Sequence, residues 1–183
     1  FDDVLVEYAG QGAPQDHMGK PIIREHLQCK WHVRTGEFGF PDFIEPSFIG
    51  AQSVSFLRRA HDAQLAHAPA GEGARFRLIT NWRLKERDPL AKLIQNQTNA
   101  FDLDAMFVGG GGSQMGRLRA LWNGHLGIDD GKLRILARTL GVSMRLGSAE
   151  ELRERLNDKF AAVGMRRIPA DEAGFGYDDI IAK

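Results

Sequence analysis

The pattern of apolar residues predicts three strands in the first half of the chain. Residues 4–6 form a short apolar run directly after two aspartates, residues 22–31 alternate apolar and polar side chains in their later part, and residues 76–80 form a third run. Short runs of this kind, rich in β-branched residues or with a period of two, are typical of β-strands. The Gly- and Pro-rich stretches 9–21 and 34–50 are predicted to be loops.

Apolar residues at helical spacing predict one helix within residues 51–67 and further helices after residue 88. An Asp-Pro pair at residue 88 is typical of a helix start, because Asp is a good N-cap and Pro fits the first helical turn. Later helices are predicted at about 113–126, from Asp130 to Gly141, and from Ser148 to Gly164, with cap residues at their ends.

The order of these elements, strands with one helix first and helices afterwards, predicts an α/β protein. It is expected to have a small α/β core and a helical subdomain at the C-terminal end. Four consecutive glycines at residues 109–112 mark a flexible break. We therefore place the core in residues 1–108 and a helical appendage and tail in residues 109–183.

Composition adds limits to this picture. The 183 residues are 43% hydrophobic and 26% charged, which is ordinary for a globular domain. No apolar stretch approaches the roughly 18 residues of a membrane span, so no membrane partner is expected. The single cysteine excludes an internal disulfide and fits a reducing compartment. Because no leader follows Phe1, we expect a cytoplasmic protein and a chain that begins inside a larger one.

The charges cancel overall, 24 basic against 24 acidic, but they are unevenly spread. Residues 1–50 carry more acids than bases, whereas residues 51–92 and 113–167 carry more bases than acids. An acidic start followed by basic segments is what a metal-dependent enzyme acting on a polyanion needs. Helices that expose Arg and Lys to water explain the same pattern, and charge alone favours that simpler interpretation.

The segment Gln28-Cys29-Lys30 is the strongest candidate for chemistry. On a strand, Gln28 and Lys30 point to the same face, where an unpaired ammonium is costly to bury. If the strand that follows Asp3 lies beside this one, a carboxylate, an amide oxygen and an ammonium come together. Mg²⁺ takes such oxygen ligands, and a lysine can orient a bound water. A solvated face of an edge strand explains the same spacing equally well.

Two segments carry a resemblance to a known family. Asp-Val-Leu-Val, a loop of about twenty residues, and Leu-Gln-Cys-Lys-Trp-His together resemble the signature of the PD-(D/E)xK nuclease superfamily in its Gln-x-Lys variant, over residues 2–32. The chain is most similar to nuclease effector domains of bacterial anti-phage defence proteins, either SAVED-linked CBASS effectors or STAND NTPases. Three further segments show a weaker similarity to the same group of proteins: Thr80-Asn81-Trp82, Asp88 to Leu90, and Trp122 to Gly127.

This resemblance implies a restriction-endonuclease-like core, a mixed sheet flanked by helices, that hydrolyses DNA with Mg²⁺ or Mn²⁺. The catalytic residues it implies are Asp3, Gln28 and Lys30, and the metal ligands are Asp3, Gln28 and the backbone carbonyl of Cys29. Asp2 is the alternative motif aspartate, and Glu7 is a candidate second acid. Many members also have a glutamate on a helix before the first motif strand. This chain starts too late to contain it, so the nuclease core is expected to be incomplete at its N-terminus.

The resemblance also implies partners. These are double-stranded DNA, further copies of the chain on activation, and a sensor or NTPase domain of the parent protein. The best candidates for phosphate contact are basic residues between positions 58 and 87: Arg58, Arg59, Arg75, Arg77, Arg83, Lys85 and Arg87. Of these, Arg58, Arg59, Arg83, Lys85 and Arg87 are assigned to DNA binding. The expected function is that of a DNA endonuclease effector. The alternative is a catalytically degenerate nuclease fold that binds DNA or docks partners, because the neutral Gln28 replaces a carboxylate.

Overall fold

A computed structural model describes residues 3–9, 12–32, 36–95, 98–144, 149–164 and 167. The chain forms two compact units, Phe1–Met144 and Arg145–Lys183. The first unit therefore continues past residue 108, where the sequence placed the domain boundary, and it includes two of the helices assigned to the appendage.

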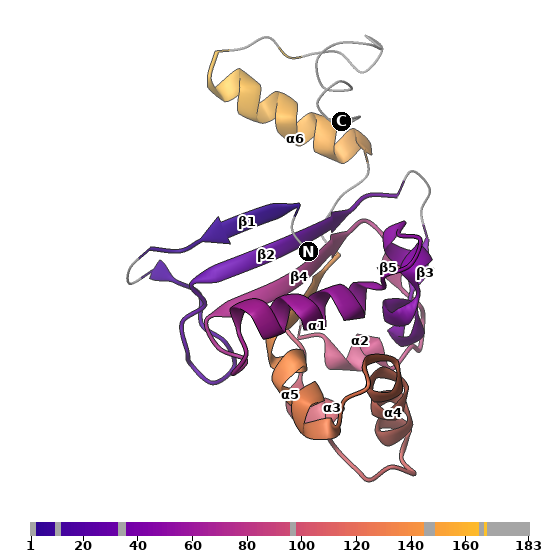
Figure 1. Ribbon diagram of the computed structural model, residues 1–183. Coiled ribbons are helices and arrows are strands. Elements are labelled where there is room, and N and C mark those ends of the chain that lie inside the picture. Colours follow the sequence, from indigo (N-terminus) through magenta and orange to yellow (C-terminus); the bar gives the residue numbers. More distant parts are fainter. Residues whose placement is uncertain are drawn as a thin grey trace. The chain divides into compact units, whose positions relative to one another are not determined.

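A four-stranded mixed sheet forms the centre of the first unit (Figure 1). In sheet order its strands are β1 (Val4–Glu7), β2 (Arg24–Lys30), β4 (Ala74–Thr80) and β6 (Leu140–Ser143). β1 runs antiparallel to β2, whereas β2, β4 and β6 are mutually parallel. The three predicted strands and the α/β class with a mixed sheet flanked by helices are confirmed.

The strand β6 was not predicted, and the helix expected to end at Gly141 ends at Thr139 instead. Leu140 and Val142 are fully buried and pair beside β4. In a short parallel strand that is buried throughout, apolar and polar residues do not alternate. Its sequence therefore resembles the apolar last turn of an amphipathic helix. Gly141 is a close-packing position, because a β-carbon there would lie 3.1 Å from the Asn99 carbonyl oxygen.

Helices of the first unit pack on one side of this sheet (Figure 1). They are α1 (Phe56–His67), α2 (Leu90–Leu93), α3 (Leu103–Met106), α4 (Gln114–Leu126) and α5 (Asp130–Thr139). The sheet face that they cover carries Phe76, Leu78, Leu140 and Val142, all fully buried. Removing this much apolar surface from water is the main force that joins the two layers.

The segment predicted as a loop at 34–50 contains two short 3₁₀ helices, η2 (Phe40–Ile44) and η3 (Pro46–Ile49). Phe38 precedes them in the short strand β3 (Glu37–Phe38), which pairs with β5 (Arg83–Leu84). An aromatic cluster anchors the segment. The ring of Phe40 stacks on Trp122 of α4 with centroids 4.0 Å apart, and the Trp122 indole donates to the Phe40 carbonyl. Irregular backbone is thus held by buried rings.

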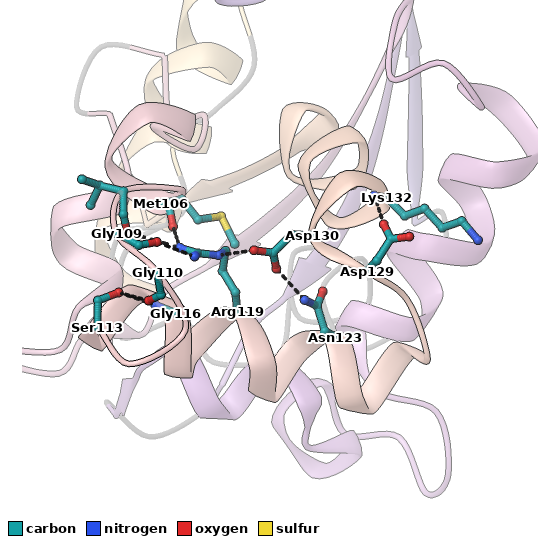
Figure 2. A network of polar contacts seen from close by, with 11 residues as sticks. Met106, Gly109, Gly110, Ser113, Gly116, Arg119, Asn123, Asp129, Asp130 and Lys132 are labelled. Carbon is teal, nitrogen blue, oxygen red and sulfur yellow. Dashed lines mark hydrogen bonds and ion pairs between the residues drawn. The ribbon is translucent and has the colours of Figure 1, made fainter.

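A network of polar contacts joins α4, α5 and the glycine-rich turn before α4 (Figure 2). Arg119 is almost fully buried; it donates to the carbonyls of Met106 and Gly109 and pairs with Asp130 at 2.9 Å. Asp130 is therefore an ion-pair partner and not the predicted N-cap. Asp129 caps α5 by accepting from the Lys132 amide.

The second unit contains α6 (Ala149–Ala162), close to the helix predicted from Ser148 to Gly164. Gly164 follows it with a φ of 81°, the left-handed conformation typical of a residue just beyond a helix end. The expected cap at Ser148 lies outside the described residues. Among the helices that the structure describes, none is long and apolar enough to cross a bilayer.

Candidate functional site

The first two strands bring Asp3 and Gln28 into direct contact. Asp3 lies just before β1, and its amide donates at 3.0 Å to the carbonyl of Leu27, which is the register partner of the next residue, Val4. The Gln28 amide nitrogen donates to Asp3 Oδ2 at 2.6 Å, and the Cys29 backbone amide donates to the same oxygen at 2.6 Å. The carboxylate is therefore fixed against the end of β2.

Gln28 is buried, and its Oε1 atom has no hydrogen-bond partner among the residues that the structure describes. A buried acceptor without a donor is costly, so this oxygen fits a ligand that supplies positive charge. A carboxylate and an amide oxygen are suitable ligands for Mg²⁺ or Mn²⁺. Within the described residues no group of three or more His, Cys, Asp or Glu side chains could hold a metal, so Asp3 and Gln28 offer only part of a coordination shell.

Lys30 shares a sheet face with Gln28, because both alternate with Cys29 along β2. Its register partner on β4 is Thr80, which is fully buried. The ammonium lies against Gly50, the residue after η3: a β-carbon on Gly50 would be 2.5 Å from Lys30 Nζ. Lys30 forms no ion pair with any carboxylate in the described part of the chain.

The chain just beyond Lys30 is held by the Asn81-Trp82 pair at the end of β4. Asn81 accepts from the His32 amide at 2.9 Å and donates to the His32 carbonyl at 2.7 Å. The His32 ring stacks on Trp82 with centroids 3.7 Å apart. Burial, and then the charge of Lys30, lower the pKa of His32, which favours its neutral form. This gives the Thr-Asn-Trp motif a structural role beside the candidate site.

The other proposed ligands lie elsewhere. Glu7 pairs with Arg24 at 3.1 Å, at the far end of β1 from Asp3, and so the structure does not bring it to Gln28. Asp2 lies outside the described residues. The Cys29 side chain points to the opposite face of the sheet; partial desolvation, and then the charge of Asp3, raise the pKa of its thiol. A reactive thiolate is thereby disfavoured at this position.

The five candidate phosphate-binding residues have different surroundings. Arg58 donates to the His125 carbonyl at 2.7 Å, and Lys85 pairs with Asp42 at 2.7 Å, so both have structural partners. Arg59 is half-buried on α1. Arg83 and Arg87 are exposed and follow β4. Since β2 and β4 are parallel, these two arginines leave the sheet at the same edge as Lys30.

The two remaining candidates for phosphate contact, Arg75 and Arg77 of β4, belong instead to a buried ion cluster on the opposite face of the sheet. Glu25 pairs with Arg77 at 2.5 Å and with Arg75 at 3.6 Å, and it accepts from the Tyr8 hydroxyl at 2.8 Å. Sequence reasoning did not detect this cluster. The alternation of Arg75 and Arg77 with apolar residues along β4 was its only signal, and that signal is equally typical of a solvated face.

These features identify the protein as an α/β domain that carries a carboxylate, an amide and an ammonium group at the carboxyl ends of its parallel strands.

No family model matches the chain. It is 33% identical over 169 residues to a protein of Enterobacter hormaechei subsp. hoffmannii (strain UCI 50), CD-NTase-associated protein 4. The match covers 90% of this chain and 33% of that protein, so the chain spans about a third of the length of the curated relative it matches.

Proposed function

We propose that this chain is the metal-dependent DNA-cleaving domain of a larger bacterial defence protein that works with a CD-NTase. The name of the relative ties that protein to a CD-NTase, and the sequence independently resembles nuclease effectors of CBASS anti-phage systems. The observation that carries the proposal is the 2.6 Å hydrogen bond from the Gln28 side-chain nitrogen to Asp3, with the one side-chain oxygen of Gln28, Oε1, buried and without a partner among the described residues.

In this proposal Asp3, Gln28 and the Cys29 carbonyl would hold one Mg²⁺ or Mn²⁺ ion. Rotation of the Gln28 amide exchanges its nitrogen and oxygen, so the side chain that now donates to Asp3 can present an oxygen beside that carboxylate. When bound, such an ion would supply polarisation of the scissile phosphate and a lower pKa for a nearby water. Hydrolysis would then join the water oxygen to phosphorus and break the phosphorus–oxygen bond to the leaving strand, whose oxygen would take up the proton.

Lys30 supplies the positive charge on this face of the sheet. Its ammonium would orient the attacking water or stabilise the negative charge that develops on the phosphate oxygens. The absence of a carboxylate partner within the described residues leaves its three donors available for such contacts.

Double-stranded DNA is the proposed substrate. Arg83 and Arg87 are the best candidates to meet its backbone, because both are exposed and follow β4, whose last residue, Thr80, is the register partner of Lys30. Arg58, Arg59 and Lys85 remain secondary candidates. Contacts of this kind position the duplex without reading its sequence, and they weaken as salt rises. A sensor or NTPase domain elsewhere in the parent protein would control assembly of several copies.

The second candidate function is a degenerate nuclease fold that binds DNA without cutting it. The observation that favours it is the donor set: Gln28 is neutral, and the described residues place one carboxylate, Asp3, at this point. A site with one carboxylate binds Mg²⁺ weakly until a substrate phosphate adds its own charge.

Plasmid cleavage by the full-length parent protein, together with its CD-NTase product, separates the two functions. We expect cutting that requires Mg²⁺, stops with EDTA and is lost in Lys30→Ala. The matched control is Lys132→Ala, which removes an exposed lysine on α5 and should cut normally. DNA binding without cutting, unchanged by Lys30→Ala, would establish the non-catalytic module.

A further inference from the structure

We propose that Gly50 is a positioning residue for Lys30: the missing side chain at position 50 leaves the space in which the Lys30 ammonium lies. This inference rests on the proposed function, in which Lys30 acts on the scissile phosphate. It assigns a role to the segment η2–η3, which the sequence identified only as an irregular loop.

The contact between Gly50 and Lys30 leaves no room for a side chain at position 50 while the ammonium stays in its place. A β-carbon built on Gly50 would lie 2.5 Å from Lys30 Nζ and 3.2 Å from Lys30 Cε. Separations under about 3 Å are not tolerated, so one of the two groups would have to move. Because the ammonium is the far end of a flexible side chain, the lysine would be displaced and the backbone would not.

The backbone at Gly50 is held in place. Its φ of 67° and ψ of 23° are left-handed, and its amide donates to the Ser47 carbonyl at 2.9 Å. The two residues before it, Phe48 and Ile49, are buried, and the Phe48 ring stacks on Phe38 with centroids 5.2 Å apart. A residue fixed by a buried aromatic cluster forms a rigid wall against the lysine.

Lys30 is fixed at its other end as well. Its backbone lies in register with Thr80 at the carboxyl ends of the two central strands, and Asn81 binds both polar backbone groups of His32, two residues further on. The side-chain torsion angles are therefore the main degrees of freedom of Lys30. In the rotamer that the structure shows, the ammonium lies along Gly50.

The test compares Gly50→Ala with Gly127→Ala in the full-length parent protein. Gly127 follows helix α4 as Gly50 follows η3, with a similar φ of 71°, but a β-carbon there would meet nothing within 4 Å. Both variants carry the same backbone strain, so each should lower the unfolding temperature by about 2–4 °C. In Gly50→Ala alone the ammonium of Lys30 is displaced.

Two readouts separate the outcomes. The first is acetylation of Lys30 by acetic anhydride, mapped by mass spectrometry and normalised to exposed Lys132. We expect the acetylation rate of Lys30 to rise several-fold in Gly50→Ala and to stay at the parent value in Gly127→Ala.

The second readout is the rate of plasmid cleavage at saturating DNA. We expect this rate to fall by about 10- to 100-fold in Gly50→Ala only, since a small displacement of a catalytic group lowers the rate by this factor. DNA binding in Ca²⁺ should change less than about twofold in either variant, because phosphate contacts elsewhere dominate affinity.

An unchanged or lower labelling rate in Gly50→Ala overturns the contact, whatever the protein catalyses. If labelling rises but cleavage stays equal to that of Gly127→Ala, the positioning role is overturned. If labelling rises and the parent protein itself does not cut DNA, the contact stands and the proposed function is what fails.

Discussion

At the scale of single residues, one carboxylate oxygen organises the end of β2. Asp3 Oδ2 accepts from both the Gln28 side chain and the Cys29 backbone amide. The same arrangement leaves Gln28 Oε1 buried without a donor, which typically costs about 1–3 kcal/mol. A cation bound at this point would recover that cost, so the site and the stability of the protein are linked.

The substitution Gln28→Glu tests this link. Without metal, the new carboxylate loses the hydrogen bond to Asp3 and faces a like charge, so the free energy of unfolding should fall by about 1–3 kcal/mol. With millimolar Mg²⁺ much of the loss should be recovered, because two carboxylates bind a divalent ion better than one. Urea denaturation with EDTA and with Mg²⁺ measures both effects.

The matched control is Glu7→Gln, on the strand of Asp3 but at its other end, where Glu7 pairs with exposed Arg24. Its stability should respond to Mg²⁺ as the parent protein does. If Mg²⁺ stabilised Gln28→Glu no more than this control, Asp3 and Gln28 would not be metal ligands.

The sequence predicted part of this site for a simple reason. Alternation along a strand puts Gln28 and Lys30 on one face, and pairing of the two strands brings Asp3 beside them. The same alternation made Glu7 a candidate, although four residues along a strand span about 13 Å. Gly50 could not be found in this way, because its contact with Lys30 depends on how an irregular segment packs against the sheet.

At the scale of elements, the glycine-rich turn before α4 is packed against the helix and not merely a flexible break. The Ser113 side chain caps α4 by accepting from the Gly116 amide, and it donates to the Gly110 carbonyl (Figure 2). A β-carbon on Gly116 would lie 2.2 Å from that carbonyl oxygen, whereas one on Gly124 in the same helix would meet nothing within 4 Å.

Two alanine substitutions in α4 should therefore have opposite effects. Gly124→Ala should stabilise the protein by about 0.5–1 kcal/mol, because alanine restricts the unfolded chain and favours helix. Gly116→Ala should destabilise it by about 1–3 kcal/mol, because backbone atoms of the turn must move. Urea denaturation of both variants measures the difference. Equal effects would show that the turn does not pack on the helix.

Arg119 is expected to be the main support of this turn. Arg119→Met leaves the carbonyls of Met106 and Gly109 without a donor and separates Asp130 from its partner, so we expect a loss of about 3 kcal/mol. Arg117, two residues earlier, is exposed and donates to the Gly112 carbonyl. Arg117→Met should cost less than about 0.5 kcal/mol in the same denaturation measurement. Similar losses in the two variants would contradict this role.

The starts of helices were easier to predict than their ends. Ser113 and Asp129 cap α4 and α5 through local hydrogen bonds that residue types and spacing indicate directly. The end of α5 depends instead on tertiary structure, since Leu140 and Val142 leave the helix to pair with β4. No local signal distinguishes a last helical turn from a short buried strand.

At the scale of the whole molecule, three half-buried or buried histidines link stability to pH. Burial is the largest cause that lowers the pKa of His32, His61 and His125. A neighbouring positive charge is the second cause for two of them, Lys30 for His32 and Arg58 for His125. The unfolded chain binds protons at these residues near the ordinary histidine value of about 6.5. Below that pH the unfolded state therefore holds more protons than the folded state.

Stability should accordingly fall as pH is lowered from about 7.5 to 5.5, because proton uptake favours the state that binds more protons. Urea midpoints across this range measure the slope. His125→Gln should flatten it, since one titrating group is removed, whereas His17→Gln replaces an exposed histidine and should leave it unchanged. A flat profile in the parent protein would contradict the prediction.

The alternation of β2 between its two faces also limits how the length of this chain can vary. One residue inserted between Glu25 and Gln28 would turn Gln28 and Lys30 toward the face that carries the Glu25 ion cluster. Two inserted residues would restore the faces but shift the amide by about 7 Å from Asp3. Insertions in the connection between β1 and β2 have neither effect, so homologous chains should differ in length there and keep β2 free of gaps.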